Sequence, residues 1–300
     1  MKCLLIKLNG NIIDITNILS EVSFGSSIEQ GCRTLEISVA NDGTKFDIGD
    51  TVNYIDADIN YVGQIQKNTN KNKQEILNFE IIDYMSHWTR SETTQIVNSK
   101  AENIAAEFCN YFGFAIGSIA NTGIATGERA YVNRSFYSII KDLYDRAGTI
   151  NGKQYIIRTS GAYFNVYEKG EIIDFKIGDS INLEYVTQED DMTQLVNKVV
   201  IYDDKNKKIG EKIKDTIGVV GIYQKVADKN DNVDEILNDI EHNLIVNSST
   251  GDNKCQSGKY IRFEDSDTNL TGIYEITEDS HTINSNGHKM ILRLKFIRLE

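Results

Sequence analysis

The sequence contains no proline among its 300 residues, although average usage predicts about fifteen. Because lysine, asparagine and isoleucine are abundant, we attribute this absence to AT-rich coding bias rather than to a structural demand. Chain reversals must therefore be built by glycine, asparagine and aspartate. The sequence supplies them between its apolar segments, at Asn9-Gly10, Asn41-Asp42-Gly43, Asn151-Gly152 and Asn286-Gly287.

Cysteines are few, and long apolar runs are missing. Cys3, Cys32, Cys109 and Cys255 form no Cys-x-x-Cys pair, which argues against a disulfide framework or a zinc site and predicts reduced, mostly packed thiols. No apolar run approaches the roughly 20 residues that a membrane helix needs. The N-terminal apolar segment is cut by Asn9-Gly10 before it reaches the length of a signal-peptide core, so we expect folding in a cytoplasm.

The composition is that of a globular protein with an acidic surplus. Apolar residues make up 40%, charged residues 25%, and the formal net charge is −12. The length predicts two or three domains. An acidic chain is not drawn to nucleic acid or to an anionic membrane by electrostatics alone, and solubility is the simplest role of the charge.

Residues 99–168 carry the most regular pattern. The segment Ser99 to Glu102 has the spacing of a capping box, and the helix that follows it is predicted to end at Gly113. A second helix is predicted from Ser135 to Gly148, and a strand hairpin follows around Ser160-Gly161. The apolar positions of the two helices share one face each: Ile104, Ala105, Phe108 and Phe112 in the first, and Phe136, Ile139, Ile140, Leu143 and Ala147 in the second.

Short alternating segments flank this region on both sides and predict β structure. About six strands are expected in residues 3–90, and another hairpin surrounds the polar loop 203–208. Apolar residues 233, 236, 237, 240 and 244 predict one helix capped by Asp231. The last hairpin is expected to turn at Asn286-Gly287, which places His281 opposite Leu292 and separates it from His288. The predicted fold class is α+β, mainly β.

Motifs that would carry chemistry are incomplete. The segment Asp265 to Ile276 begins like a calcium loop but has Leu270 at the sixth position and isoleucine at the twelfth, so a polar hairpin is the better interpretation. The separated His281 and His288 do not predict a metal site. His87-Trp88 at a domain junction favours packing over a carbohydrate platform.

The carboxylate and glycine patterns are equally unspecific. The runs Glu189-Asp190-Asp191 and Asp203-Asp204 are expected in polar loops, where solvated carboxylates cannot form the opposed acid–base pair of a glycosidase. Neither Gly-x-Ser-x-Gly, His-Glu-x-x-His nor a Cys/His signature is found. The glycines near 117 and 123–127 are not followed by Gly-Lys-Ser/Thr. We therefore predict no catalytic residue, no cofactor-binding residue, no metal ligand and no enzymatic activity.

Several segments, in this order along nearly the whole chain, resemble PBSX-type, XkdQ-like tail hub proteins of the late control protein D superfamily. No single motif is specific, but the succession is. Loop lengths and the missing prolines depart from the family. The matching segments are Ile28 to Ser38, Phe46 to Val52, Tyr61 to Ile65, Ala101 to Ala105, Gly113 to Gly117, Ser135 to Ile140, Lys198 to Asp203, Gly272 to Ile276, His281 and His288 to Met290.

The resemblance implies two tail-tube-like β-barrel domains with an α/β insertion between them: residues 1–95, 96–185 and 186–300, the last with one inserted helix. It implies the structural hub of a contractile phage tail, or of a phage-tail-like bacteriocin, assembled as a homotrimer. Part of the acidic surplus is then expected to line the lumen and to keep passing DNA from adhering. The alternatives are a tail-associated peptidoglycan hydrolase and a carbohydrate-binding module.

The implied partners are those of a baseplate: the tail tube or tube-initiator protein, the central spike, wedge and LysM-type adaptor proteins, and the tape measure protein. DNA is expected only in passage through the lumen, and no stable membrane association is expected. The implied location is the virion or tail particle, assembled in the cytoplasm of the host bacterium.

Overall fold

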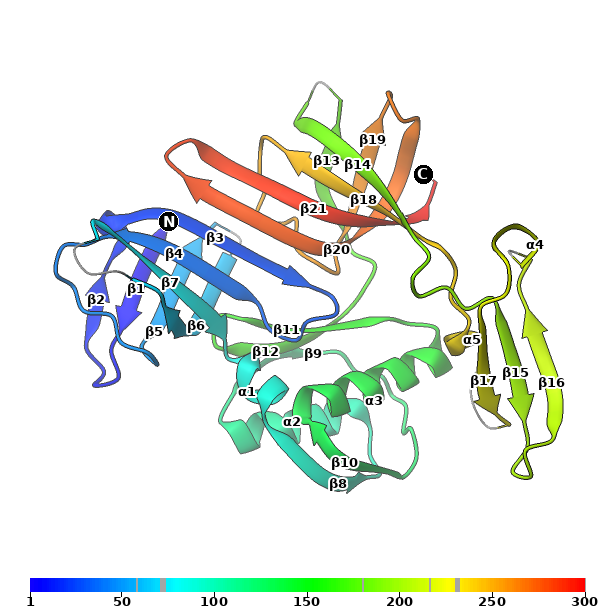
Figure 1. Ribbon diagram of the computed structural model, residues 1–300. Coiled ribbons are helices and arrows are strands. Elements are labelled where there is room, and N and C mark those ends of the chain that lie inside the picture. The colour runs from blue at the N-terminus through cyan, green and yellow to red at the C-terminus, as the bar shows by residue number, and fades with distance from the viewer. Residues whose placement is uncertain (58, 71–73, 180, 216, 230–232, 300) are drawn as a thin grey trace. The chain divides into compact units, whose positions relative to one another are not determined.

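The computed structural model (Figure 1) describes residues 1–299 except 58, 71–73, 180, 216 and 230–232. The chain divides into two compact units, a larger one of Met1–Val186 with Val246–Glu300 and a smaller one of Thr187–Ile245. Both are mainly β, as the sequence predicts. Among the described residues, no helix is both long and apolar enough to span a bilayer.

The N-terminal β-region of the larger unit alternates buried and exposed residues. In β4, for example, Leu35, Ile37 and Val39 are buried while Thr34 and Glu36 are exposed, because successive side chains point to opposite faces of a strand. The elements are β1 (Lys2–Ile6), β2 (Ile12–Asp14), η1 (Thr16–Ile18), β3 (Leu19–Ser27), β4 (Thr34–Ala40), β5 (Thr51–Asp56), β6 (Ile59–Asn68) and β7 (Ile76–Asp83).

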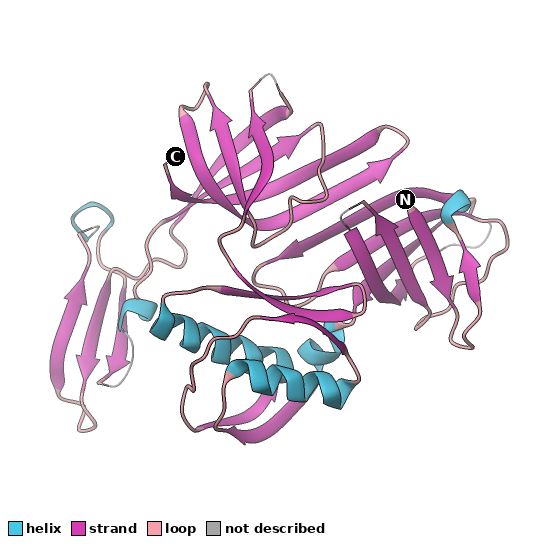
Figure 2. Ribbon diagram, turned by 180° about the vertical axis from the view of Figure 1, so that it is seen from behind, coloured by secondary structure: helices cyan, strands magenta, loops and turns pink. Residues whose placement is uncertain are grey.

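An α/β region follows, with helices between two small sheets (Figure 2). Strands β8 and β10 form an antiparallel pair, and β9, β12 and β11 form the second sheet. The helices and both sheets share one core, which includes Val97, Tyr131, Leu143 and Phe164. The elements are α1 (Met85–Arg90), β8 (Glu92–Val97), α2 (Ala101–Phe112), β9 (Ala115–Ile119), β10 (Arg129–Ser135), α3 (Phe136–Asn151), β11 (Tyr155–Ser160) and β12 (Tyr163–Glu168).

The ends of α2 and α3 confirm part of the predicted capping. Gly113 ends α2 with φ +71°, and the Ser135 hydroxyl accepts a hydrogen bond from the Ser138 backbone N–H at the start of α3. The predicted capping box is wrong, because Glu102 binds Thr122 and the neighbouring backbone instead of closing on Ser99. Helix α3 also continues past Gly148 to Asn151, so its C-cap is Gly152 with φ +73°.

The second β-region of the larger unit is joined to the first through β20. The first half of β20 pairs with β19, and its second half, residues 278–284, pairs with residues 21–27 of β3. Within the described residues this produces one sheet with the order β14-β18-β21-β20-β3-β4-β7-β6-β5-β1-β2 and with β13-β19 branching from β20. The elements are β13 (Ile172–Gly178), β19 (Tyr260–Asp265), β20 (Leu270–Asn284) and β21 (Gly287–Arg298), with β14 (Leu183–Asp191) and β18 (Glu241–Ser248), each of which has residues in both units.

The hairpin β20–β21 turns one residue earlier than predicted. The Asn284 side chain accepts a hydrogen bond from the Asn286 backbone N–H at 2.9 Å, and this Asx turn closes the hairpin before Gly287. His281 consequently lies opposite Met290 and not opposite Leu292. The predicted separation of the two histidines is therefore wrong.

His281 and His288 instead form a pair in which His281 is buried and His288 is half-buried. Their ring centroids lie 5.2 Å apart, and Nδ1 of His281 lies 3.0 Å from Nε2 of His288. Nε2 of His281 donates to the Cys255 carbonyl oxygen at 2.9 Å, so its Nδ1 accepts from His288 when both rings are neutral. Burial lowers the pKa of His281, and burial together with His281 lowers the pKa of His288 to about 4.

The smaller unit contains a three-stranded sheet of order β16-β15-β17, in which β15–β16 is the predicted hairpin. The helix predicted over residues 233–244 is wrong beyond its first turn, because Leu244 belongs to β18 and is buried there. The proposed cap, Asp231, lies outside the described residues. The elements are β15 (Lys198–Tyr202), β16 (Lys208–Ile213), α4 (Ile217–Val220), β17 (Gln224–Asp228) and α5 (Val233–Ile236).

The different roles of Ser135 and Ser99 give a matched test of capping. Ser135→Ala removes the acceptor of an N-terminal helix N–H and should lower the free energy of unfolding by about 1 kcal/mol. Ser99→Ala removes no helix cap and should change it by less than about 0.5 kcal/mol. Urea unfolding monitored by circular dichroism measures both. Equal losses would contradict this assignment of the caps.

The histidine pair predicts a pH dependence of stability. An imidazole with a lowered pKa takes up protons in the unfolded chain between pH 6.5 and about 4, so the free energy of unfolding falls as the pH is lowered through this window. His288→Gln should reduce the loss between pH 7 and 4.5 by about 2 kcal/mol relative to wild type. Denaturant titrations at each pH measure the free energy of unfolding, and the exposed His87→Gln serves as the control. Parallel pH profiles for wild type and His288→Gln would contradict the prediction.

Candidate functional site

Strands β7, β4, β3, β20 and β21 form a continuous antiparallel array with two chemically different faces. The buried face carries Val22, Phe24, Leu35, Ile37, Val39, Phe79, Ile81, His281, Met290 and Leu292. The opposite face, called the polar face below, carries Glu21, Ser23, Ser27, Thr34, Glu36, Ser38, Asn78, Glu80, Glu278, Ser280, Thr282, Asn284, Lys289, Ile291 and Arg293. The strand period of two separates these two sets.

Short side chains that hydrogen-bond to one another cover much of the polar face. The Ser23 and Thr282 hydroxyl oxygens lie 3.2 Å apart across the β3–β20 pairing, and the Ser38 hydroxyl donates to the Asn78 side-chain oxygen at 2.7 Å. Ile291, and Ile76 of β7 on the same face, are large apolar exceptions, each 47% exposed. Such a surface offers little apolar area for adhesion.

Carboxylates dominate the charge of the polar face. Arg293 is paired with Glu278 at 3.4 Å, and Lys289 with Glu184 at 3.2 Å. Glu80 in turn lies 3.7 Å from the amine of Lys67, so the acidic surplus of the face rests on the remaining glutamates, Glu21 and Glu36. A polyanion that passes such a surface is repelled rather than bound.

The pairing of β3 with β20 is what makes the array continuous. At Gly25, a Cβ would lie 2.5 Å from the Asp279 carbonyl oxygen, closer than any side chain tolerates. Glycine is therefore required for the two backbones to approach here. This contact unites strands from the two ends of the sequence in one surface.

A buried polar junction lies beneath this pairing, on the inner side of the array. Asp279 accepts hydrogen bonds from the Ser26 hydroxyl at 2.6 Å and the Ser257 backbone N–H at 2.7 Å. Asp83, at the end of β7, accepts from the Thr159 hydroxyl of β11 at 2.6 Å. Burial raises the pKa of Asp83 to about 6, against the opposing effect of the Thr159 hydrogen bond. These bonds fix β3 to β20 and β7 to β11.

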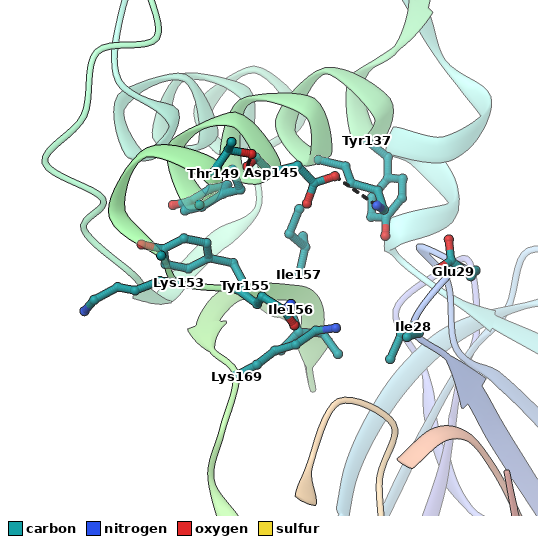
Figure 3. A pocket seen from close by; sticks show the side chains of 15 residues that line it. Ile28, Glu29, Tyr137, Asp145, Thr149, Lys153, Tyr155, Ile156, Ile157 and Lys169 are labelled. Carbon is teal, nitrogen blue, oxygen red and sulfur yellow. Dashed lines mark hydrogen bonds and ion pairs between the residues drawn. The ribbon is translucent and has the colours of Figure 1, made fainter. Parts of the chain in front are cut away.

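A cavity of about 500 Å³ lies between α3 and β11. Figure 3 shows Asp145 and Thr149 of α3 facing Tyr155 of β11, with Glu29 at the other side. Asp145 is paired with Lys141 at 3.0 Å. The lining residues, all of them described, include no serine, cysteine or histidine, so the cavity lacks the usual nucleophile–base pair.

The structure places the residues weighed from the sequence in structural roles. Trp88 is fully buried and stacks on Phe164 with a centroid distance of 4.5 Å, which confirms packing. The loop predicted for Glu189-Asp190-Asp191 is wrong, because this run ends strand β14. Asp190 pairs with His242 at 2.6 Å and Asp204 with Lys229, at exposed positions. Among the described residues, no group of three or more His, Cys, Asp or Glu side chains is arranged to hold a metal ion.

The four cysteine thiols are free, and all except the half-buried Cys32 are buried. Burial raises the pKa of Cys3 and Cys109 to about 12 and that of Cys32 to about 11, and it raises the pKa of Cys255 further. Thiols with a raised pKa carry little thiolate and are poor nucleophiles. Their role in the described structure is packing.

Solved structures of low sequence identity share this fold. The prophage MuSo2 43 kDa tail protein from Shewanella oneidensis is 10% identical with a TM-score of 0.72, over 99% of this chain and 98% of that chain. The tail protein from Neisseria meningitidis MC58 is 12% identical with a TM-score of 0.71, over 98% and 96%.

The E. coli c3393 protein, a component of the type VI secretion system with structural similarity to the T4 bacteriophage tail proteins gp27 and gp5, also matches. It is 9% identical with a TM-score of 0.58, over 94% of this chain and 74% of that chain. No curated protein sequence matches the chain.

The chain thus shares its mainly β fold with two phage tail proteins and a type VI secretion component. A family model described as YQBQ-like matches residues 22–295, which is most of the sequence. The chain therefore belongs to the YQBQ-like family.

Proposed function

We propose that the protein is the structural hub of a contractile phage tail or phage-tail-like bacteriocin baseplate, joining the tail tube to the central spike. The observation that carries this proposal is the continuous array through which β3 and β20 unite both β-regions in one polar face. The shared fold with two phage tail proteins and a type VI secretion component supports it. The PBSX-type hub of the late control protein D superfamily is the subtype that we propose.

The proposed organisation follows the sequence: domains 1–95 and 186–300 are tail-tube-like barrels, and domain 96–185 is the insertion. Two separate buried cores support a division near these bounds, one around Leu35, Tyr54 and Ile81 and one around Leu143 and Phe164. Met85 and Trp88, at the end of the first segment, pack in the second core. Two barrel-like domains per chain would let a homotrimer present six to a sixfold tube. The insertion, with its well-packed helices, would then give neighbouring proteins a rigid surface for docking.

In this assembly the partners would be the tail tube or tube-initiator protein, the central spike, wedge and LysM-type adaptor proteins, and the tape measure protein. The proposed location is the virion or tail particle, assembled in the host cytoplasm. The role needs no catalytic residue. A tail-associated peptidoglycan hydrolase is the alternative.

Oligomeric state tests the hub proposal directly. The purified chain, alone or mixed with its tube and spike neighbours, should give a complex that contains three copies, measured by light scattering after size-exclusion chromatography. Trimerisation should bury exposed strand edges of each subunit. A stable monomer or dimer in the presence of both neighbours would contradict the proposal, and clearing of peptidoglycan by the purified chain in a zymogram would favour the hydrolase.

We further propose that the polar face lines the lumen. The double variant Glu36→Lys and Glu80→Lys should then make the assembled ring bind duplex DNA at least tenfold more tightly than wild type at 50 mM salt, because the lumen would attract phosphates. The matched control is Glu107→Lys with Glu128→Lys, which makes the same charge change at exposed positions in the insertion. Fluorescence anisotropy measures the affinities.

Two results would contradict the lumen assignment. The first is equal DNA affinity of the two double variants, since surface charge alone would then account for binding. The second is a structure of the assembled ring with a neutral or basic bore.

A further inference from the structure

A second cavity, of about 570 Å³, adjoins the buried polar junction. Its polar lining differs from that of the cavity beside α3, because it includes two arginines, Arg33 at the start of β4 and Arg158 of β11. Only 7% of Arg33 and 8% of Arg158 are exposed. Buried guanidinium groups are stable only when a counter-charge and hydrogen-bond acceptors surround them.

The hydrogen bonds of both guanidinium groups are incomplete. Nε and Nη2 of Arg33 and Nε of Arg158 are buried without an acceptor. Arg158 donates through Nη1 to the Gln256 side chain at 3.2 Å and through Nη2 to the Ser257 carbonyl oxygen, which are both uncharged acceptors. Burial, followed by the like charge of Arg33, lowers the pKa of Arg158 to about 10. The two cations therefore lie close enough to repel each other.

The nearby carboxylates balance the two guanidinium charges only in part. Asp83 is hydrogen-bonded to Thr159 and the Met85 backbone, and Asp279 accepts from Ser26 and Ser257 through Oδ1. Oδ2 of Asp279 is buried without a hydrogen-bond partner, so this carboxylate acts on Arg158 by its charge and fills none of the open donors of the two arginines. Asp174 also lines the cavity. At the edge of the cavity, Glu168 pairs with Lys153 and Glu171 with Lys259. Lys254 adds a further cation to the lining.

We propose that this cavity is a binding site for a small oxyanion, held between Arg33 and Arg158 with Lys254 at its edge. A phosphate or carboxylate group accepts several N–H bonds at once and matches the planar donors of arginine. The donors that lack acceptors in the chain would be satisfied by such a group after small side-chain rotations. The oxyanion comes either from free phosphate or from a carboxylate, and this site is independent of the proposed hub role.

Thermal unfolding of the full chain tests the site, with inorganic phosphate, acetate and chloride compared at equal ionic strength. Phosphate or acetate at millimolar concentration should raise the unfolding temperature saturably, whereas chloride should not. A response to phosphate alone identifies free phosphate as the ligand type, and a response to acetate identifies a carboxylate. No saturable response to either oxyanion would overturn the proposal.

Arg33→Met supplies the decisive variant. Since it removes a buried cation with unsatisfied donors, it should fold, with an unfolding temperature at or above that of wild type in anion-free buffer. It should weaken oxyanion affinity at least tenfold by isothermal titration calorimetry. The exposed Arg134→Met, the control for loss of an arginine, should keep wild-type affinity. An unchanged affinity in Arg33→Met would overturn the site, as would an equal loss in both variants.

Discussion

The pairing of β3 with β20 is the contact on which the rest of the architecture depends. It joins Ser23 to Thr282, which are 259 residues apart in the sequence, and it carries the sheet from the N-terminal β-region into the C-terminal one. Closing so long a loop costs conformational entropy before any strand contact repays it. The register must also be fixed, because a slip by one residue would turn the polar side chains inward and Phe24 outward.

Several local features fix this register. Gly25 permits the close backbone approach at Asp279, and the hydrogen bonds of Asp279 to Ser26 and Ser257 are satisfied in only one alignment. The imidazole of His281 stacks on Phe24 with a centroid distance of 4.6 Å. Buried polar groups contribute specificity in this way, because a wrong alignment leaves them without partners. The same junction also costs desolvation free energy. Asp83, whose pKa is raised, and the two arginines are charged groups held away from water.

Local pattern was sufficient to predict much of the fold from sequence. Period-two alternation identified most strands of the first β-region, and Gly113 and Ser135 marked helix ends as expected, since these signals act within a few residues. The prediction was wrong where contacts with residues distant in the sequence determine the local structure. Glu102 has the spacing of a capping box but binds Thr122, and residues 241–244 have helical spacing but become part of a strand. The turn of the last hairpin was misplaced because Asn284, rather than Asn286-Gly287, determines where it closes.

The polar face and the arginine cavity differ in how far the sequence reveals them. The polar face follows from the alternation of side chains once β3 and β20 are known to be neighbours. Only that long-range pairing could not be predicted from the sequence. For the cavity, the sequence contains a weaker signal, a charged residue in the apolar phase of a strand. Arg33 continues the buried series Leu35, Ile37 and Val39, and Asp83 continues the series Phe79 and Ile81. A charged residue in the apolar phase of a strand must find a partner inside the protein. For Asp83 that partner is Thr159, within the chain, whereas Arg33 still has donors without acceptors. The difference between these two residues is the physical reason to look for an occupant beside Arg33 and for none beside Asp83.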